Sequence, residues 1–364
     1  MNRTLLSLCT LLLLFPLAGC SQNPDPLPTE TTGNSLHVPE TQPDPIELCG
    51  TAYPRDTESL TLHNPDAGEL FRLLPQFSAM HQVHLIQPEM KACDLFLLCD
   101  TFPQITFTWE KEVLGTVYAS DTQEIDLSGI QFSSLTELEQ QLEYFPRLQK
   151  LILCDCGLDN ETLAAFRDRV RSQYKVVWSV QIKTLTVRTD ETTFMPVKHD
   201  VFIFDDHTKD LIYCEDMIVV DVGHMPIHNI DFVTGMPHLQ YLIVADTLIR
   251  DISAIQDHKE LVYLEIFKLN IDDYTPLLSC TALEDLNLSQ TSGDPAVLAQ
   301  MPWLKNLWMV QCSVSDENRL LLTQSLPDTR IEFDLGWTQG DNWRTLEHYF
   351  IMRDLLDMAP NAWW

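Results

Sequence analysis

Few residues of this 364-residue chain have the types and spacing that catalysis or metal binding needs. No zinc-protease, nucleophile-elbow, phosphate-loop or EF-hand pattern occurs, and only 12 glycines are present. Asp205, Asp206, His207 and Asp210 could bind a cation, but they lack the alternate spacing of a calcium loop, which favours a solvated turn. His224 has no evident partner, which favours a surface or packing histidine over a ligand or base. We therefore predict no catalytic residue, no metal, no cofactor and no enzyme activity.

The residue with a predicted chemical role is Cys20. Arg3 precedes a mostly apolar run over residues 5–17, which is too short to span a bilayer and fits the core of a signal peptide. The run ends in Leu-Ala-Gly-Cys, which resembles a bacterial lipobox. The thiol would accept a diacylglyceryl group after cleavage of residues 1–19. We expect a lipid-anchored protein at the cell membrane that faces the extracytoplasmic side; the alternative is an ordinary signal peptide with a chance cysteine.

Eight further cysteines follow, and an even number outside the cell would permit disulfides. Their spacing does not indicate a dense disulfide framework, and no Cys-x-x-Cys pair occurs. Cys154 and Cys156 lie in a predicted strand and its exit turn, which favours a structural role over a metal or redox site. The eight are Cys49, Cys93, Cys99, Cys154, Cys156, Cys214, Cys280 and Cys312.

Residues 20–55 are predicted to form a disordered tether. Prolines recur there among Thr, Glu, Asp, Gln and Asn, so little apolar surface can be buried. An extended polyproline-like chain of this length reaches on the order of 100 Å, enough to lift a domain off a membrane. The alternative is a tail without a spacing role. The prolines are Pro24, Pro26, Pro28, Pro39, Pro43 and Pro45.

The charge of the chain is strongly negative. Its net charge is −30, and cleavage of residues 1–19 would remove one arginine, leaving 22 basic and 53 acidic residues, or −31. Such a charge argues against nucleic acid or anionic lipid as partners. It permits basic partners or divalent cations, although acidity that simply keeps an exported protein soluble is the favoured explanation.

A leucine repeat over residues 217–333 is the strongest indication of the fold. Leu239, Leu261, Leu283 and Leu304 are separated by 22, 22 and 21 residues, and a second leucine follows each after three positions. Alternation in a short strand points every second side chain inward, and stacked coils bury the inward ones together. We therefore predict an α/β solenoid with a curved parallel sheet and an irregular convex side.

These blocks resemble the leucine-rich repeat family, in particular the 22-residue class of internalin-like surface proteins. Residues 251–254 and 273–276 are similar to its Asp-Ile-Ser-Pro segment, whereas the usual asparagine is replaced by Met, Thr, Leu, Thr and Cys. Shorter stretches, such as residues 154–157, 185–190, 343–345 and 352–354, are similar to bacterial leucine-rich-repeat lipoproteins. That group implies no settled biochemical role.

The flanking regions are less regular. Residues 56–182 carry fainter copies of the repeat, with strands expected near Leu60, Val83, Ile105, Ile125, Leu151 and Val176, and an ordinary βα domain is the alternative. Residues 183–216 interrupt the period and are predicted to be an insertion or junction. Residues 334–364 contain an amphipathic helix over 343–358, expected as a C-terminal cap over the open end of the core.

The concave face of the predicted sheet is the expected binding site. Strand alternation places aromatic and acidic side chains outward there, a composition typical of protein or peptide interfaces. The alternatives are that the cap, the insertion or a second copy covers them, that the coils pack permanently against another envelope protein, or that an unrecognised enzyme site exists. The predicted ligand-binding residues are Tyr241, Tyr263, Glu265, Phe267, Asp285, Asn287 and Trp308.

Overall fold

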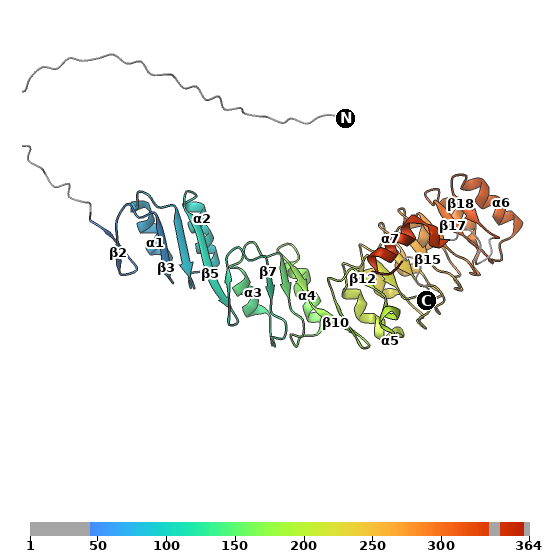
Figure 1. The fold of residues 1–364 in the computed structure, drawn as a ribbon, viewed down its shortest axis with the longest axis horizontal. Coiled ribbons are helices and arrows are strands. Elements are labelled where there is room, and N and C mark those ends of the chain that lie inside the picture. Colours follow the sequence, from blue (N-terminus) through green and yellow to red (C-terminus); the bar gives the residue numbers. More distant parts are fainter. Residues whose placement is uncertain (1–43, 335–342, 360–364) are drawn as a thin grey trace, which may run out of the picture. The chain divides into compact units, whose positions relative to one another are not determined.

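The computed structural model describes residues 44–334 and 343–359 (Figure 1). The chain divides into two units, 1–44 and 45–364, and the second contains every helix and strand reported below. The predicted signal peptide, Cys20 and most of the predicted tether lie outside the described residues. No helix in the described part of the chain has the length and apolar composition needed to cross a bilayer.

The folded part of the chain begins earlier than the sequence predicted. Strands β1 (Ile46–Leu48) and β2 (Thr51–Tyr53) form an antiparallel hairpin inside the segment expected to be disordered. Ile46 and Leu48 are buried, and the turn residues Cys49 and Gly50 have φ of 51° and 72°, typical of a tight hairpin. The prediction of disorder was wrong at 46–53, because an alternating apolar pair binds this segment to the core despite its proline-rich surroundings.

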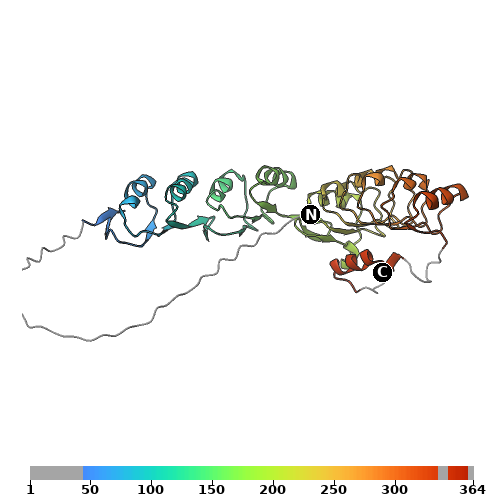
Figure 2. The same cartoon turned by 90° about the horizontal axis from the view of Figure 1, so that it is seen from above.

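All six strands predicted in the N-terminal half are confirmed, but they do not form one sheet. Sheet β3-β4-β5-β6 is parallel except for β6, and sheet β7-β8-β9 is wholly parallel. Helices connect the parallel strands and lie on one side of them (Figure 2). The strands are β3 (Ser59–His63), β4 (Gln82–Ile86), β5 (Thr106–Val113), β6 (Thr116–Ala119), β7 (Glu124–Asp126), β8 (Lys150–Ile152) and β9 (Lys175–Val177), and the helices are α1 (Ala67–Leu73), η1 (Leu74–Gln76), α2 (Ala92–Thr101), α3 (Thr136–Leu142) and α4 (Asn160–Val170).

Two β-hairpins interrupt the parallel strands with the same geometry. The first joins β5 to β6, and the second pairs β10 (Ser179–Ile182) with β11 (Leu185–Arg188). The Trp109 amide donates to the Ser120 hydroxyl at 3.2 Å, and the Trp178 amide donates to the Thr189 hydroxyl at 3.1 Å. Both pairs are 11 residues apart. The N-terminal half is therefore two copies of one module, each closed by a hairpin before the next sheet begins.

The predicted solenoid is confirmed, and its sheet extends beyond 217–333, because β12 in the predicted junction is its first strand. Seven parallel strands stack in the order of the chain, and Leu242, Leu264, Leu286 and Leu307 stand in register and are fully buried. Short 3-10 helices return the chain between strands. The strands are β12 (Thr193–Phe194), β13 (Val219–Asp221), β14 (Tyr241–Ile243), β15 (Tyr263–Glu265), β16 (Asp285–Asn287), β17 (Asn306–Trp308) and β18 (Arg330–Glu332), and the 3-10 helices are η4 (Asp231–Gly235), η5 (Ser253–Ile255), η6 (Thr275–Ser279) and η7 (Pro295–Gln300).

Threonine partly replaces the missing asparagine ladder. The hydroxyls of Thr247 and Thr291 donate to the carbonyls three residues earlier, at 2.8 and 2.7 Å, and Cys312 makes a thiol contact of 3.1 Å to the Leu288 carbonyl. Leu269 occupies the same position and is buried among apolar side chains. The coils therefore stay in register although hydrogen bonding at this position is incomplete.

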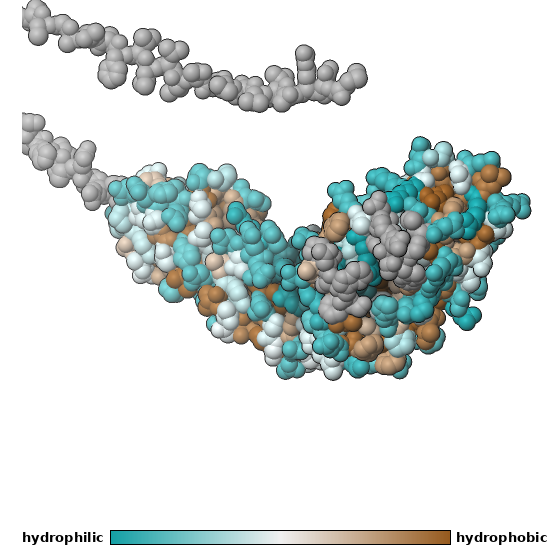
Figure 3. Space-filling model, turned by 45° about the vertical axis from the view of Figure 1, so that its right-hand side comes forward, coloured by the Kyte–Doolittle hydropathy of each residue, from teal (hydrophilic) through white to brown (hydrophobic). Residues whose placement is uncertain are grey.

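Residues 183–216, predicted to be an insertion or junction, contain strands β11 and β12 followed by short helices, and β12 belongs to the solenoid sheet. Phe194 and Ile203 are buried, as the sequence predicted, whereas Phe204, which was also expected inside, is 49% exposed. In the view of Figure 3, hydrophobic residues lie in patches between hydrophilic ones. The short helices are η2 (Pro196–His199), α5 (Asp205–Thr208) and η3 (Lys209–Tyr213).

The C-terminal helix does not take the position expected of a cap. Helix α6 (Asp316–Ser325) follows the last regular coil and contributes Leu322 to the main core. The chain then returns through η8 (Trp343–Thr345) and α7 (Glu347–Leu355), which lie on the face of the sheet opposite the 3-10 helices (Figure 2). The amphipathic helix was predicted correctly, but it covers the outward face of the strands, because its apolar side chains find aromatic partners there.

Candidate functional site

The predicted ligand-binding side chains are buried rather than exposed. Tyr241, Tyr263 and Phe267 are 4%, 1% and 9% exposed, and they form one apolar cluster with Tyr349 and Met352 of α7. The alternative that the C-terminal segment covers this face is therefore correct for these aromatics. Glu265, Asp285, Asn287 and Trp308 are also buried.

Helix α7 is held on this face by polar contacts at both ends. Near its start, His348 Nδ1 lies 2.8 Å from the Asp285 carboxylate. At its end, Lys198 Nζ donates to the Leu356 carbonyl at 2.7 Å. Between them the buried residues Tyr349, Met352 and Leu356 recur at helical spacing. Apolar packing and two polar contacts together fix the helix across β13 to β16.

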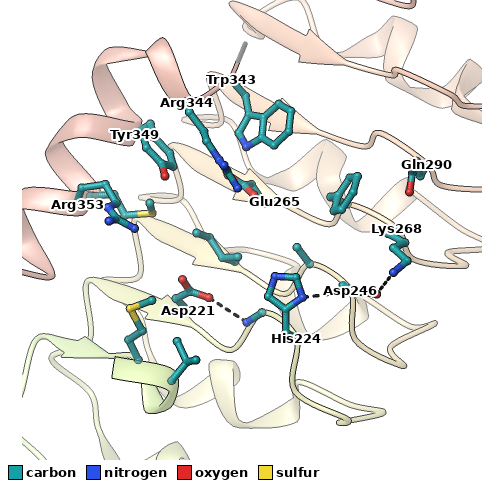
Figure 4. Close-up of a pocket in the computed structure, with 17 residues that line it drawn as sticks. Asp221, His224, Asp246, Glu265, Lys268, Gln290, Trp343, Arg344, Tyr349 and Arg353 are labelled. Carbon is teal, nitrogen blue, oxygen red and sulfur yellow. Dashed lines mark hydrogen bonds and ion pairs between the residues drawn. The ribbon is translucent and has the colours of Figure 1, made fainter. Parts of the chain in front are cut away.

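A cavity of about 380 Å³ remains between the sheet and the C-terminal segment (Figure 4). The strands contribute Asp221, Ile243 and Glu265 to its wall, and the segment contributes Tyr349 and Met352. A volume of this order suits one small ligand or one side chain of a larger ligand. Sequence reasoning could not place the C-terminal residues here, because nothing in their local pattern specifies where the helix docks. The wall also includes Met195, Val197, Gly223, His224, Ala245, Asp246, Phe267, Lys268, Gln290, Trp343, Arg344 and Arg353.

Two carboxyl groups lie on the strand side of the cavity. Asp221, Ile243 and Glu265 stand in register on neighbouring strands, so the two acids flank one isoleucine. Burial raises the pKa of Glu265 to about 7, although the Tyr263 hydroxyl donates to it, and Asp221 raises that pKa further. Burial likewise raises the pKa of Asp221 to about 6, although a 2.9 Å hydrogen bond from the Gly223 amide acts to lower it. Desolvation therefore favours the protonated form of both acids.

A row of polar side chains forms the rim of the cavity. His224, Asp246, Lys268 and Gln290 follow successive strands, and all have left-handed backbones with φ between 54° and 62°. Asp246 lies 3.1 Å from His224 and 2.6 Å from Lys268, and these partners hold its pKa below the ordinary value even though burial raises it. His224 therefore has a partner one coil away, which the 22-residue spacing of the repeat could have revealed.

The other residues singled out from the sequence form no site. Asp205 accepts hydrogen bonds from the backbone and ring of His228, at 2.7 and 2.8 Å, so it ties a turn together. Within the described ranges, no three His, Cys, Asp or Glu side chains come together in a way that could hold a metal ion. Cys154 accepts a hydrogen bond from Ser179 at 3.1 Å and Cys156 is buried, which agrees with structural roles.

The geometry of the stacked coils decides the fold type. Leucines one coil apart stand in register on parallel strands, and each strand is followed by a turn and a return along the opposite side. The chain adopts the leucine-rich-repeat fold. The leucine-rich-repeat solenoid extends over β12 to β18, and α7 is an addition to its outward face.

Comparison with solved structures finds leucine-rich-repeat proteins. An internalin (inlF) from Listeria monocytogenes matches with a TM-score of 0.32 and 16% identity, over 61% of this chain and 51% of that one. Internalin C2 of the same species matches with a TM-score of 0.34 and 15% identity, over 61% of this chain and 87% of that one. A leucine-rich-repeat protein of Leptospira interrogans matches with a TM-score of 0.35 and 13% identity, over 71% of this chain and 74% of that one. This chain spans about half the length of the first internalin.

No protein-family model and no curated protein matches the chain.

The buried Glu265 carboxyl makes the stability of the protein depend on pH. Between its ordinary pKa of 4.5 and its folded pKa of about 7, Glu265 stays protonated in the folded chain while the unfolded chain releases that proton. The free energy of unfolding should therefore fall as the pH rises through this interval. We expect urea denaturation to show lower stability at pH 8 than at pH 5, and Glu265→Gln to reduce the difference. An unchanged difference in the variant would contradict burial of this carboxyl.

Proposed function

We propose that the chain is a membrane-anchored extracellular binding module of the internalin-like 22-residue class. It binds a protein or peptide on the outward face of the solenoid. The observation that carries the proposal is the cavity between this face and α7, where ionisable side chains lie beside apolar ones. A few polar groups within apolar walls are typical of ligand sites, because the walls supply affinity and the polar groups fix orientation.

The position of α7 changes how the ligand would bind. The buried aromatics Tyr241 and Tyr263 serve as a platform for α7 rather than as direct contacts. The ligand instead meets the rim formed by His224, Asp246 and Lys268 and inserts a side chain into the cavity. The proposal keeps the predicted face of the sheet as the binding site. The residues that contact the ligand are those of the rim and the cavity, not the buried aromatics.

A cavity-filling substitution tests this proposal. Peptides can be selected from a random displayed library for binding to the full chain in nonionic detergent. The selected peptides should bind the wild type, and Ala245→Trp should lower their affinity at least tenfold. Ala245 is 5% exposed and lines the cavity, so a larger side chain there occupies the space of the ligand. Leu248→Trp, at a residue 51% exposed in the next turn, is the matched control.

Fluorescence anisotropy with labelled peptides measures both affinities, and the thermal midpoint shows that each variant folds. Equal affinity for the wild type and the folded Ala245→Trp variant would contradict a binding site in the cavity.

Anchoring through Cys20 is the second part of the proposal. Its support is the Leu-Ala-Gly-Cys sequence at the end of an apolar run of suitable length. Two acyl chains on the mature N-terminal cysteine would hold the domain stably at a membrane, whereas one chain holds it only marginally.

Substitution of the lipid-bearing thiol tests the anchor. Expressed in a bacterium with lipoprotein-processing enzymes, the wild type should enter the detergent phase on Triton X-114 partition and carry two acyl chains by mass spectrometry. Cys20→Ser should stay in the aqueous phase, because serine offers no thiol for the diacylglyceryl group. Cys49→Ser, which changes an exposed thiol of β1-β2, is the control that should still partition into detergent. An unmodified wild-type N-terminus would rule out the anchor.

One observation favours a second candidate function, permanent packing against another envelope protein. Phe350, Ile351 and Leu355 on the outer side of α7 are 43%, 40% and 40% exposed. Three large apolar side chains on one short helix are an apolar surface of the kind that a permanent partner covers. In that case the partner copurifies in fixed stoichiometry and the cavity binds no free peptide.

A further inference from the structure

The β5-β6 hairpin leaves one edge of its sheet open. β6 is the terminal strand of that sheet, and β7 belongs to the next one. The Ser120 amide donates to the Trp109 carbonyl at 2.8 Å, which sets the alternation of the ladder, so Val117 and Ala119 direct their backbone groups away from β5. Among the described residues, the Thr122 amide donates to the Ala119 carbonyl, and nothing bonds to Val117 on this side. Two amides and one carbonyl therefore remain open to another strand.

The side chains along this edge are apolar or neutral, and most of them are exposed. Val117 is 51% exposed, and Thr116 and Ala119 are exposed beside it. Leu114, at the tip of the hairpin, is 45% exposed and has a φ of 51°, a conformation in which asparagine or glycine is usual. β6 contains no charged residue and no proline. Native proteins protect free edges with such residues, and an edge without them is a site where another strand can pair.

The second hairpin shows that the fold does not require this composition. In β10-β11, the positions equivalent to Leu114, Val117 and Ala119 carry polar side chains. They are Lys183, Thr186 and Arg188. The Lys183 amine donates to the Phe202 carbonyl at 2.7 Å, and Arg188 lies 2.8 Å from Asp190. Because the two hairpins share their geometry, the apolar edge of the first is a property of its sequence and not of the fold.

The charge of the chain indicates which partner suits the edge. Two copies with a net charge of −30 repel each other, which disfavours pairing of β6 with a second copy. Glu112 and Glu110 lie opposite Val117 and Ala119, and Asp121 follows β6. These acids favour a neutral strand with basic residues at its ends. An extended segment can bond to the open backbone groups, whereas a helix satisfies its own hydrogen bonds internally.

We propose that β6 binds an extended segment of a partner protein, which adds to the sheet as a further strand. Backbone groups of the segment hydrogen-bond to the amide and carbonyl of Val117 and to the amide of Ala119. An aliphatic side chain of the segment packs against Val117, and Leu114 contacts the segment at the hairpin tip. This site is separate from the cavity under α7, and the inference does not depend on the proposed function.

A designed peptide tests the inference on the full chain in nonionic detergent. The probe is blocked Lys-Thr-Val-Thr-Val-Thr-Val-Lys, which alternates aliphatic and polar side chains between basic ends. We expect saturable binding by fluorescence anisotropy and slower hydrogen exchange of the β6 amides by mass spectrometry. The same peptide with N-methylated valines should bind at least tenfold more weakly, because it keeps the side chains but lacks the donors for the Val117 carbonyl.

Proline substitutions at equivalent positions of the two hairpins supply the matched control. Val117→Pro removes an amide that the hairpin does not use, and edge strands accept proline at such positions. It should lower the affinity for the probe at least tenfold, whereas Thr186→Pro on β11 should leave it unchanged. Ala119→Arg, which gives β6 the residue type of the equivalent position in β11, should also lower it at least tenfold. The thermal midpoint shows that each variant folds.

The remaining outcomes separate this inference from the proposed function. No saturable binding, or equal losses in Val117→Pro and Thr186→Pro, would overturn the edge as a binding site. Binding that is lost in Ala245→Trp but unchanged in Val117→Pro would also overturn it, because the probe would then occupy the cavity. Binding lost in Val117→Pro but unchanged in Ala245→Trp supports the edge, whatever the cavity binds.

The oligomeric state tests the choice of partner. Sedimentation equilibrium in a density-matched nonionic detergent should show a monomer without the peptide. Dimers that Val117→Pro dissociates would identify a second copy as the occupant of the edge and overturn the assignment to a partner protein.

Discussion

The docking of α7 on the outward face of the sheet is the contact on which the candidate site depends. It buries Tyr241, Tyr263 and Phe267, which would otherwise be exposed on the strands of a solenoid. Burial of three aromatic side chains stabilises the docked helix by several kcal/mol at roughly 25 cal/mol per Å². Because the helix and sheet do not fit completely, a cavity remains between them. The covered face and the candidate site are thus consequences of one packing event.

The repeat determines which side chains lie on this face. Residues one coil apart lie side by side on neighbouring strands and form a row across the sheet. The residue type at one position of each coil therefore sets the character of a whole row. One row carries the buried Glu265 and the half-buried Asp221 on either side of Ile243. The row at the left-handed turns carries the ionic rim of His224, Asp246 and Lys268. Both rows end up at the same opening because they follow the same strands. The regular strands of the repeat therefore place the acidic and ionic side chains together at one site.

Leucine spacing predicted the strands because inward burial is a local property of each coil. The same reasoning placed the aromatic side chains outward correctly and then assumed that they were free. Nothing in the periodicity specifies that residues 343–358 return across β14 and β15, since long-range docking depends on shape complementarity between distant segments. The hairpins after Trp109 and Trp178 were missed for a related reason, because the search followed single coils of about 22 residues and not a longer module. The pairing of His224 with Asp246 was within reach of the sequence, as the two are one coil apart.

A double-mutant cycle on His348 and Asp285 tests the docking of α7 most directly. The two side chains lie 2.8 Å apart, Asp285 is 4% exposed, and they come from α7 and β16, so they interact only if the helix lies on the sheet. Urea denaturation of the wild type, His348→Ala, Asp285→Ala and the double variant should give a coupling energy of about 0.5–3 kcal/mol. Effects that add to within about 0.3 kcal/mol would show that the helix does not dock there, and the cavity would lose one of its walls.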